Sequence, residues 1–261
     1  MYKPHMTPPR PHPSLPPVVV IGATGGVGRG VVAALLEAGT PVLAVARDAG
    51  RLAALRRAAG ASAPLGVVPG SVAGDADGAQ LAAVLKALRR PLAGVVVCVS
   101  GERERARLFE RPAQFLGASL EANVLPVLVA ARHLVPLLAA SQRRLPFLVL
   151  GGPAADVPWA GYGQLSVAAS AQRMLVRVLR EELADESVRV QQLVVGAPVR
   201  TEERGTCVCA HWPSALDVGR AVRGVLADNQ SREAVVRLAP PPGARSAPRG
   251  GHPIPVNEVL P

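Results

Sequence analysis

Aromatic residues and lysine are scarce in this chain. Phe, Trp and Tyr make up only 3% of the residues, so an apolar core has to be built from Ala, Val and Leu. Lys3 and Lys86 are the only lysines, and arginine carries nearly all of the positive charge. The net charge is +10, but the arginines are scattered, and no aromatic side chains alternate with them to stack on bases. The composition therefore favours a solvated basic surface over nucleic-acid binding.

Cysteine is also rare, and its pattern argues against both a disulfide framework and a zinc site. Cys98, Cys207 and Cys209 do not form a disulfide framework, which is typical of a reducing compartment, and we expect a cytoplasmic location. Cys207, Cys209 and His211 lie close together in the sequence, but a zinc site needs four ligands and no second cysteine pair exists. No metal site is predicted.

No apolar run of membrane-spanning length is free of interruptions. The most apolar run, residues 125–140, contains Arg132, His133 and Pro136, so we expect no membrane span, and His133 is interpreted as a helix-surface residue. Residues 1–16 are rich in proline and have no apolar signal core, which predicts a flexible arm.

Short β-branched runs alternate with longer Ala- and Leu-rich segments. Strands are predicted at residues 17–22, 41–46, 65–70, 92–101, 145–152, 188–198 and 233–240. Helices are predicted at residues 28–39, 49–60, 78–90, 113–140, 159–183 and 214–228. This alternation is typical of an α/β fold in which a doubly wound parallel sheet lies between two helical layers. We expect one such Rossmann-type domain over residues 17–240 and an irregular Pro/Gly-rich tail at 241–261.

The stretch "VVVIGATGGVGRG" is the most specific motif. Gly22, Gly26 and Gly28 lie where the first strand turns into the first helix. A tight turn needs a residue without Cβ there, and a second such residue lets the backbone approach a pyrophosphate at the helix N-terminus. Because the turn follows a strand and opens a helix, it indicates dinucleotide binding.

The end of the second strand, "AVARDAGRL", bears on which dinucleotide binds. An arginine in this corner accommodates a 2′-phosphate, whereas NAD sites place a carboxylate there. Arg47 favours NADP(H), and Arg29 is a further candidate for phosphate contact. Asp48 would suit NAD(H), but it also precedes a helix and is interpreted as its N-cap.

With these motifs in place, the chain resembles the short-chain dehydrogenase/reductase (SDR) family over about residues 17–240. "IGATGGVG" matches the family's glycine turn, "ASLEANVLPVLVAARHLVPLL" resembles its fifth helix, and "GYGQLSVAASAQRMLVRVLREEL" resembles its active-site helix. The resemblance implies that Asn123 is the active-site asparagine and Tyr162 the catalytic tyrosine. It implies cofactor contacts from Gly22, Thr24, Gly26, Val27, Gly28, Arg47, Ser71, Val72, Ser100, Gly101, Pro198, Val199 and Thr201.

The catalytic pattern departs from the family's. The family spaces its tyrosine and lysine as Tyr-x-x-x-Lys, and that spacing puts Ser166 at the lysine position, where it carries no charge. Gly151 and Gly152 stand where the family has hydroxyls. A phenol without a neighbouring ammonium stays near its reference pKa of about 10, so it is a poor base but can still donate a proton. We therefore treat Tyr162, Asn123 and Ser166 as the candidate catalytic residues.

Two functions are compatible with this pattern. The first is an NADP(H)-dependent reductase of a carbonyl compound, with Tyr162 as the proton donor and Trp159 and Trp212 bordering the cleft. The second is a catalytically inactive nucleotide-binding or structural subunit, paired with an active relative. The resemblance also implies dimers or tetramers formed through the helices at 113–140 and 161–185. The small-molecule substrate is not identified by the sequence.

Overall fold

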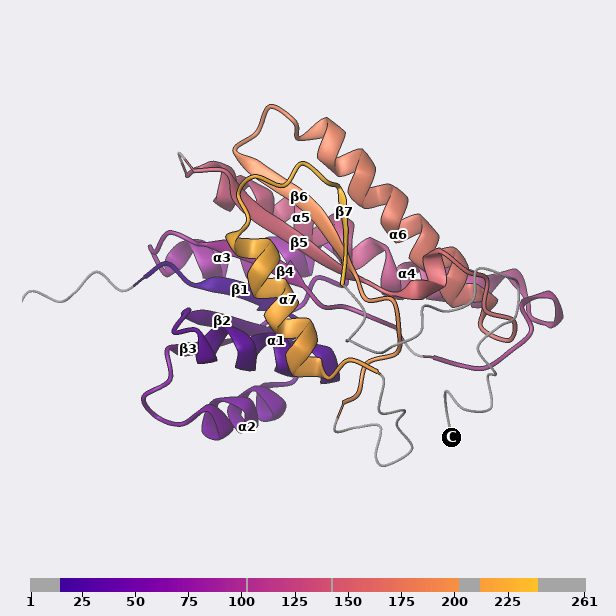
Figure 1. The fold of residues 1–261 in the computed structure, drawn as a ribbon, viewed down its shortest axis with the longest axis horizontal. Coiled ribbons are helices and arrows are strands. Elements are labelled where there is room, and N and C mark those ends of the chain that lie inside the picture. Colours follow the sequence, from indigo (N-terminus) through magenta and orange to yellow (C-terminus); the bar gives the residue numbers. More distant parts are fainter. Residues whose placement is uncertain (1–14, 102, 142, 202–211, 239–261) are drawn as a thin grey trace, which may run out of the picture.

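The chain folds around one parallel sheet, shown in Figure 1. The computed structural model describes residues 15–101, 103–141, 143–201 and 212–238. The strands are β1 (Val18–Ile21), β2 (Val42–Ala46), β3 (Leu65–Pro69), β4 (Gly94–Val97), β5 (Leu145–Gly151), β6 (Val188–Val194) and β7 (Val235–Arg237). Their order is β3-β2-β1-β4-β5-β6-β7, and every neighbouring pair is parallel. The predicted doubly wound sheet is confirmed.

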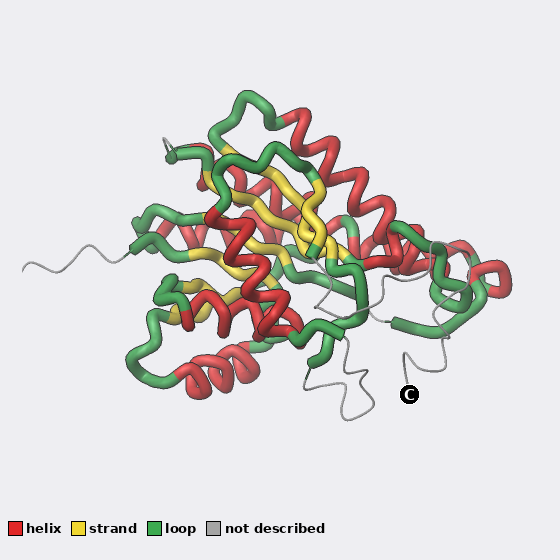
Figure 2. The backbone as a smooth tube through the Cα atoms, in the orientation of Figure 1, coloured by secondary structure: helices red, strands yellow, loops and turns green. Residues whose placement is uncertain are grey.

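Helices cover both faces of the sheet (Figure 2). The α-helices are α1 (Gly26–Glu37), α2 (Ala49–Ala59), α3 (Asp75–Ala87), α4 (Ala113–Asn123), α5 (Leu125–Ala139), α6 (Gly163–Glu182) and α7 (Ala215–Ala227). Two short 3-10 turns, η1 (Leu108–Glu110) and η2 (Pro153–Ala155), lie in the connections. Helices α1, α2 and α7 pack on one face, and α3, α5 and α6 pack on the other. The predicted arm at 1–16 and tail at 241–261 fall almost wholly outside the described residues, so those boundaries stay predictions.

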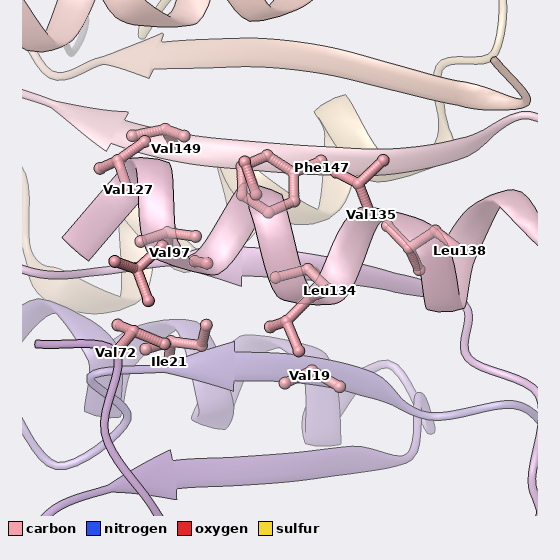
Figure 3. Packing of buried hydrophobic residues seen from close by; sticks show 14 of the residues in the cluster. Val19, Ile21, Val72, Val97, Val127, Leu134, Val135, Leu138, Phe147 and Val149 are labelled. Carbon is pink, nitrogen blue, oxygen red and sulfur yellow. The ribbon is translucent and has the colours of Figure 1, made fainter. Parts of the chain in front are cut away.

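The strands are buried on both sides, which explains their unbroken runs of valine. In β1, β2 and β4 every residue is buried, because each strand lies inside the sheet and has helices above and below. Figure 3 shows one of the two cores, in which Leu134 and Leu138 of α5 pack near Val19 and Phe147 of the strands. With so few aromatics, Phe147 is the largest fully buried side chain in this part of the molecule.

The helix predicted over 113–140 is divided in two at Val124. Pro126 has no backbone N–H, so it removes one helical hydrogen bond, and Val127 donates to the Val124 carbonyl instead of one turn back to Asn123. The freed Asn123 carbonyl accepts a hydrogen bond from the Gln172 side chain, 3.0 Å away. The Gln172 side chain thereby replaces the helical donor that the Asn123 carbonyl lacks at the break.

Residues Ala113–Ala139, taken together, are long and apolar enough to cross a membrane by length and composition, with a mean hydropathy of 1.6 in the best window. Helix α5 nevertheless places Val127, Leu134 and Leu138 in the core of the sheet layer. A buried core helix has the same composition as a membrane span, so this feature is weak evidence for a membrane.

Asp156 fastens the end of η2 to two other elements. Its carboxylate accepts hydrogen bonds from Arg173 of α6, at 2.5 and 3.1 Å, and from Arg237 of β7, at 2.8 and 2.9 Å. The bonds from Arg237 and then Arg173 hold the pKa of the Asp156 carboxyl well below its usual range.

This arrangement predicts acid-sensitive stability. Because the folded-state pKa is depressed, the contribution is fully present above the unfolded pKa of about 4 and is lost as the pH falls toward the folded value. Asp156→Asn should lower the free energy of unfolding by about 1 kcal/mol at pH 7, a small value because the group is partly exposed. Urea melts should show the gap between the two proteins narrowing from about pH 4 to about pH 2. A gap that stays constant over this range would contradict the assignment.

Candidate functional site

A cavity of about 580 Å³ opens at the carboxyl edge of the sheet. It lies beside the ends of β1 and β4, where the strand order changes direction, which is where ligands bind in doubly wound folds. The predicted site residues that line it are Gly26, Val27, Gly28, Ser100, Gly101, Asn123, Tyr162, Pro198, Val199 and Thr201. Trp159 also lines it, as expected, whereas Trp212 does not.

The glycine turn leaves backbone exposed at one end of this cavity. Gly22 has φ +76°, and a Cβ on Gly28 would lie 2.1 Å from the Gly22 carbonyl oxygen, so the turn closes tightly only without side chains. Helix α1 begins at Gly26, and its N-cap residue Gly25 makes no side-chain cap. The first N–H groups of α1 thus remain available for phosphate oxygens. A Cβ on Gly26 would meet the Thr201 side chain at 2.7 Å, so Thr201 lies directly over the turn.

Basic side chains gather at the corner beyond β2. Asp48 accepts a hydrogen bond from the Arg51 backbone at 2.9 Å, which confirms that it caps α2. The guanidinium groups of Arg29 and Arg51 both donate to the Thr24 carbonyl, at 3.1 and 2.9 Å. Arg47, the first residue after β2, is exposed. Arg51 was missed by the sequence analysis, although its position one helical turn after the β2 corner is the signal that would have indicated it.

Four further predicted cofactor contacts lie outside the cavity wall. Gly22 and Thr24 belong to the turn itself. Ser71 accepts a hydrogen bond from the backbone of Ala73 at 3.0 Å, which folds the loop after β3 back on itself. Val72 is only 4% exposed and packs in the core. Its side chain supports the sheet rather than the cavity.

Asn123 is held by backbone groups. Its side-chain oxygen accepts from Gly101 N–H at 2.9 Å, and its side-chain nitrogen donates to the Ser119 carbonyl at 2.8 Å. Asn123 thereby fixes the loop after β4, which contains Ser100, against the end of α4. Its position at the break between two helices makes both bonds possible, so its role in this structure is to shape the wall.

The structure places Tyr162, but not Ser166, in the wall of the cavity. Tyr162 is 5% exposed, lines the cavity and stands at the N-cap of α6, outside the regular helix. Ser166 does not line the cavity, and its hydroxyl accepts from Trp159 N–H at 3.0 Å. The Ser166 N–H donates to the Tyr162 carbonyl at 3.3 Å, so the two residues are one helical turn apart, as expected. Only Tyr162 lines the cavity, and a catalytic role for Ser166 stays a prediction.

The wall of the cavity on α6 is built by other residues. Leu165, Ala169 and Gln172 follow Tyr162 along one face of the helix, which is the face that lines the cavity. Leu165 and Ala169 are the pair on this face that lie four residues apart. Beyond Tyr162, the part of α6 that lines the cavity therefore presents two apolar side chains and one amide, and no charged group.

The missing hydroxyl at Gly151 has a structural cause. A Cβ on Gly151 would lie 2.5 Å from the side-chain nitrogen of Gln192, which itself donates to Gln172 at 3.0 Å. A serine does not fit at position 151 while this buried amide pair is present. Gly152 has open space around its Cα and tolerates a side chain.

Arg103 and Cys98 also line the cavity and were not predicted as site residues. Loss of hydration lowers the pKa of Arg103, while its electrostatic attraction to Tyr162 raises it, so the two groups are neighbours. Burial raises the pKa of the Cys98 thiol to about 12, which keeps it protonated and excludes it as a nucleophile at neutral pH. No group of three His, Cys, Asp or Glu side chains suited to a metal occurs in the described part of the chain. Cys207, Cys209 and His211 lie outside it.

Residues 17–207 match the model of the short-chain dehydrogenase family. The chain belongs to this family. The 3-oxoacyl-[acyl-carrier-protein] reductase of rhamnolipid biosynthesis from Pseudomonas aeruginosa is 28% identical to it over 207 residues, which are 78% of this chain and 79% of that protein.

Solved structures of the family share the fold. A short-chain dehydrogenase/reductase from Mycobacterium ulcerans superposes with a TM-score of 0.76 at 20% identity, covering 86% of this chain and 88% of that one. An NADPH-bound short-chain oxidoreductase from Pseudomonas aeruginosa PAO1, described as having an atypical catalytic center, has a TM-score of 0.75 at 20% identity, covering 88% and 98%. These likenesses show the fold of the dehydrogenase.

Short-chain dehydrogenases are oxidoreductases whose fold holds a nicotinamide cofactor, and the residues present here fit such a group at its phosphate end. A Cβ on Gly22 would lie 2.3 Å from the Cys98 carbonyl oxygen, and one on Gly28 would lie 2.1 Å from the Gly22 carbonyl oxygen, so the turn keeps its shape only with glycine at both positions. At the nicotinamide end the dehydrogenase has kept Asn123 and Tyr162 in the wall but has Leu165 and Ala169 on the facing helix. The phosphate end of the site therefore follows the family's pattern, whereas the nicotinamide end departs from it.

Proposed function

We propose that this short-chain dehydrogenase reduces a ketone or aldehyde with NADPH and that Tyr162 donates the proton. The observation that carries the proposal is that Tyr162 lines the same cavity as the glycine turn. A phenol hydroxyl is able to donate a proton to the alkoxide that develops as a carbonyl is reduced.

The preference for NADP(H) over NAD(H) rests on charge. Arg29 and Arg51 donate to the Thr24 carbonyl, and Arg47, directly after β2, is exposed. Asp48, the carboxylate that would favour NAD(H), is used as a helix cap. This corner suits a 2′-phosphate. The Pseudomonas aeruginosa structure above contains NADPH, and a metagenomic oxidoreductase of the family was solved with NADP.

Each part of the wall has a role in this reaction. The N–H groups at the start of α1 bind the pyrophosphate. NADPH, when bound, supplies the hydride that adds to the carbonyl carbon. Tyr162 donates its hydroxyl proton to the carbonyl oxygen, and solvent later returns that proton. Trp159, Leu165 and Val199 exclude water, which strengthens the hydrogen bond from the phenol.

Tyr162→Phe tests the proposal. The substitution removes the acidic hydroxyl and keeps the ring, so NADPH binding should be unchanged while carbonyl-dependent NADPH oxidation falls about 100-fold or more. Fluorescence titration with NADPH and steady-state rates over a carbonyl panel measure the two effects, and a thermal melt checks that the fold is retained. Equal turnover in both proteins would exclude Tyr162 as the acid.

A second function is favoured by one specific observation. Leu165 and Ala169 on the cavity face of α6, together with Gly151, leave few groups able to move a proton. A nucleotide-binding subunit without turnover, paired with an active relative, fits this wall. NADPH binding with no oxidation over the panel, in wild type and Tyr162→Phe alike, is the result that distinguishes it from the reductase.

We also propose that copies of the chain associate through α5 and α6. Two large apolar residues on α5 and three on α6 are each more than 40% exposed, namely Leu125, Leu128, Val167, Met174 and Val178, and exposed apolar groups of this kind mark interaction surfaces. A dimer or tetramer of this chain, or an assembly with an active relative, would cover them. Sedimentation velocity of the purified protein measures this. The cytoplasmic location stays a prediction.

A further inference from the structure

Arg103 is the one charged side chain among the described residues that line the cavity. The other wall residues are glycines, apolar side chains and neutral polar groups. Arg103 has no carboxylate partner among the described residues, whereas its neighbours do: Arg107 pairs with Glu110, and Arg111 pairs with Glu104. With no carboxylate of the described residues paired to it, the guanidinium of Arg103 can present its N–H donors to a ligand in the cavity.

The loop that carries Arg103 is fastened to the start of α6. Ala106 N–H donates to the Gly161 carbonyl at 2.8 Å, and the Gln164 side chain donates to the Glu104 carbonyl at 2.7 Å. Ala106 also forms a β-bridge with Tyr162. The backbone that supports Arg103 and the backbone that supports Tyr162 are therefore held side by side, so a ligand bound by one is within reach of the other.

We propose that Arg103 binds the carboxylate of an anionic substrate, a 2-oxo or 3-oxo carboxylic acid, and thereby directs the substrate's carbonyl oxygen toward Tyr162. This inference rests on the proposed reductase function and specifies its substrate class. In such acids the carboxylate and the carbonyl are separated by one or two bonds between carbon atoms. One small ligand can therefore contact two groups that, like Arg103 and Tyr162, are carried by adjoining backbone segments.

The chemistry of the two groups gives the selectivity. A guanidinium presents parallel N–H donors that match both oxygens of a carboxylate, and this bidentate pairing is stronger than a neutral hydrogen bond. A neutral ester of the same acid offers only weak acceptors and no charge. The apolar part of the substrate would lie against Trp159, Leu165 and Val199, which line the same cavity. Arg103 keeps contact with solvent, so we expect a preference for the acid of about tenfold rather than several thousandfold.

The test compares acids with their methyl esters. Benzoylformate and methyl benzoylformate, and acetoacetate and methyl acetoacetate, are titrated calorimetrically into the full chain, alone and saturated with NADP⁺. Wild type should bind each acid about tenfold more tightly than its ester. Arg103→Leu should remove this preference, and Arg103→Lys should retain part of it because the charge remains. Arg107→Leu is the matched control: its side chain is 74% exposed, it is absent from the cavity wall, and it should leave the preference unchanged.

The outcomes separate this inference from the function on which it rests. Equal binding of acid and ester, binding of neither, or a preference that survives Arg103→Leu would each overturn the role of Arg103. NADPH oxidation is followed with the same four compounds. Turnover without preference for the acids would leave the reductase standing and exclude the anion site. An Arg103-dependent preference without turnover would support the anion site and contradict the reductase.

Discussion

Replacing Gly219 by alanine is expected to lower the free energy of unfolding by about 2 to 3 kcal/mol. Helices α1 and α7 cross at Gly30 and Gly219. A Cβ on Gly219 would lie 2.3 Å from the Gly30 carbonyl oxygen, and one on Gly30 would lie 2.1 Å from the Ala215 carbonyl oxygen. Since the atoms in the way are backbone, relief requires the helices to separate and the core formed by Val31, Leu35 and Val222 to loosen.

Gly224 provides the matched control on the same helix. It is exposed, and no atom lies within 4 Å of where its Cβ would be. Gly224→Ala should raise the free energy of unfolding by about 0.5 to 1 kcal/mol, because alanine loses less backbone entropy in a helix than glycine. Urea melts of the three proteins measure both changes. Destabilisation by both substitutions, or by neither, would contradict the close crossing of α1 and α7.

The same close crossing shows what a sequence pattern conveys and what it does not. The alternation of valine runs with Ala-rich segments predicts the order of strands and helices, because a strand buried on both faces has to be apolar throughout. It does not reveal that Gly30 and Gly219 meet, since they are nearly 190 positions apart and nothing local requires a glycine at either one. Local chemistry was sufficient at the β1–α1 turn, where the constraint is between near neighbours.

Within the cavity wall, the position of Tyr162 was predictable, but the surroundings of Ser166 were not. The four-residue spacing does place them one helical turn apart, since the Ser166 N–H donates to the Tyr162 carbonyl. The Ser166 hydroxyl, however, accepts a hydrogen bond from the Trp159 N–H, and Ser166 does not line the cavity. The replacement of the family's hydroxyls by glycine was visible in the sequence. Its cause at Gly151 was not, because Gln192 approaches from the neighbouring strand β6.

The division of the 113–140 helix shows the same limit. A proline near the start of a helical segment is compatible with a helix that begins there, and Pro126 marks that start. The sequence does not indicate whether the residues before Pro126 continue the same helix or form a separate one. At the break the Gln172 side chain donates a hydrogen bond to the Asn123 carbonyl. This contact joins two segments that are far apart in the chain, so the local sequence does not reveal it.

If the cavity face of α6 limits catalysis, then restoring a phenol and an ammonium on that face should increase it. The double variant Leu165→Tyr, Ala169→Lys places the family's pair one turn apart on residues that line the cavity and are only partly buried, so both new side chains have room. Carbonyl-dependent NADPH oxidation should rise about 100-fold, the lower end of what a positioned acid contributes. An ammonium beside the new phenol also lowers the pKa of that phenol, so the rate should become pH-dependent in the range where the phenol titrates.

Ser166→Lys is the comparison that tests whether the pair at positions 162 and 166 or the pair at positions 165 and 169 supports catalysis. Ser166 is 9% exposed, and its hydroxyl is bonded to Trp159 N–H, so a lysine there would bury a charge away from the cavity and break that bond. It should lower the melting temperature and leave turnover unchanged. An increase in turnover with Ser166→Lys and none with the double variant would show that positions 162 and 166 are the ones that hold the catalytic pair. The opposite result would mean that this dehydrogenase retains a site able to bind its cofactor and substrate, and that two substitutions on one face of α6 account for the difference between it and a fully equipped relative.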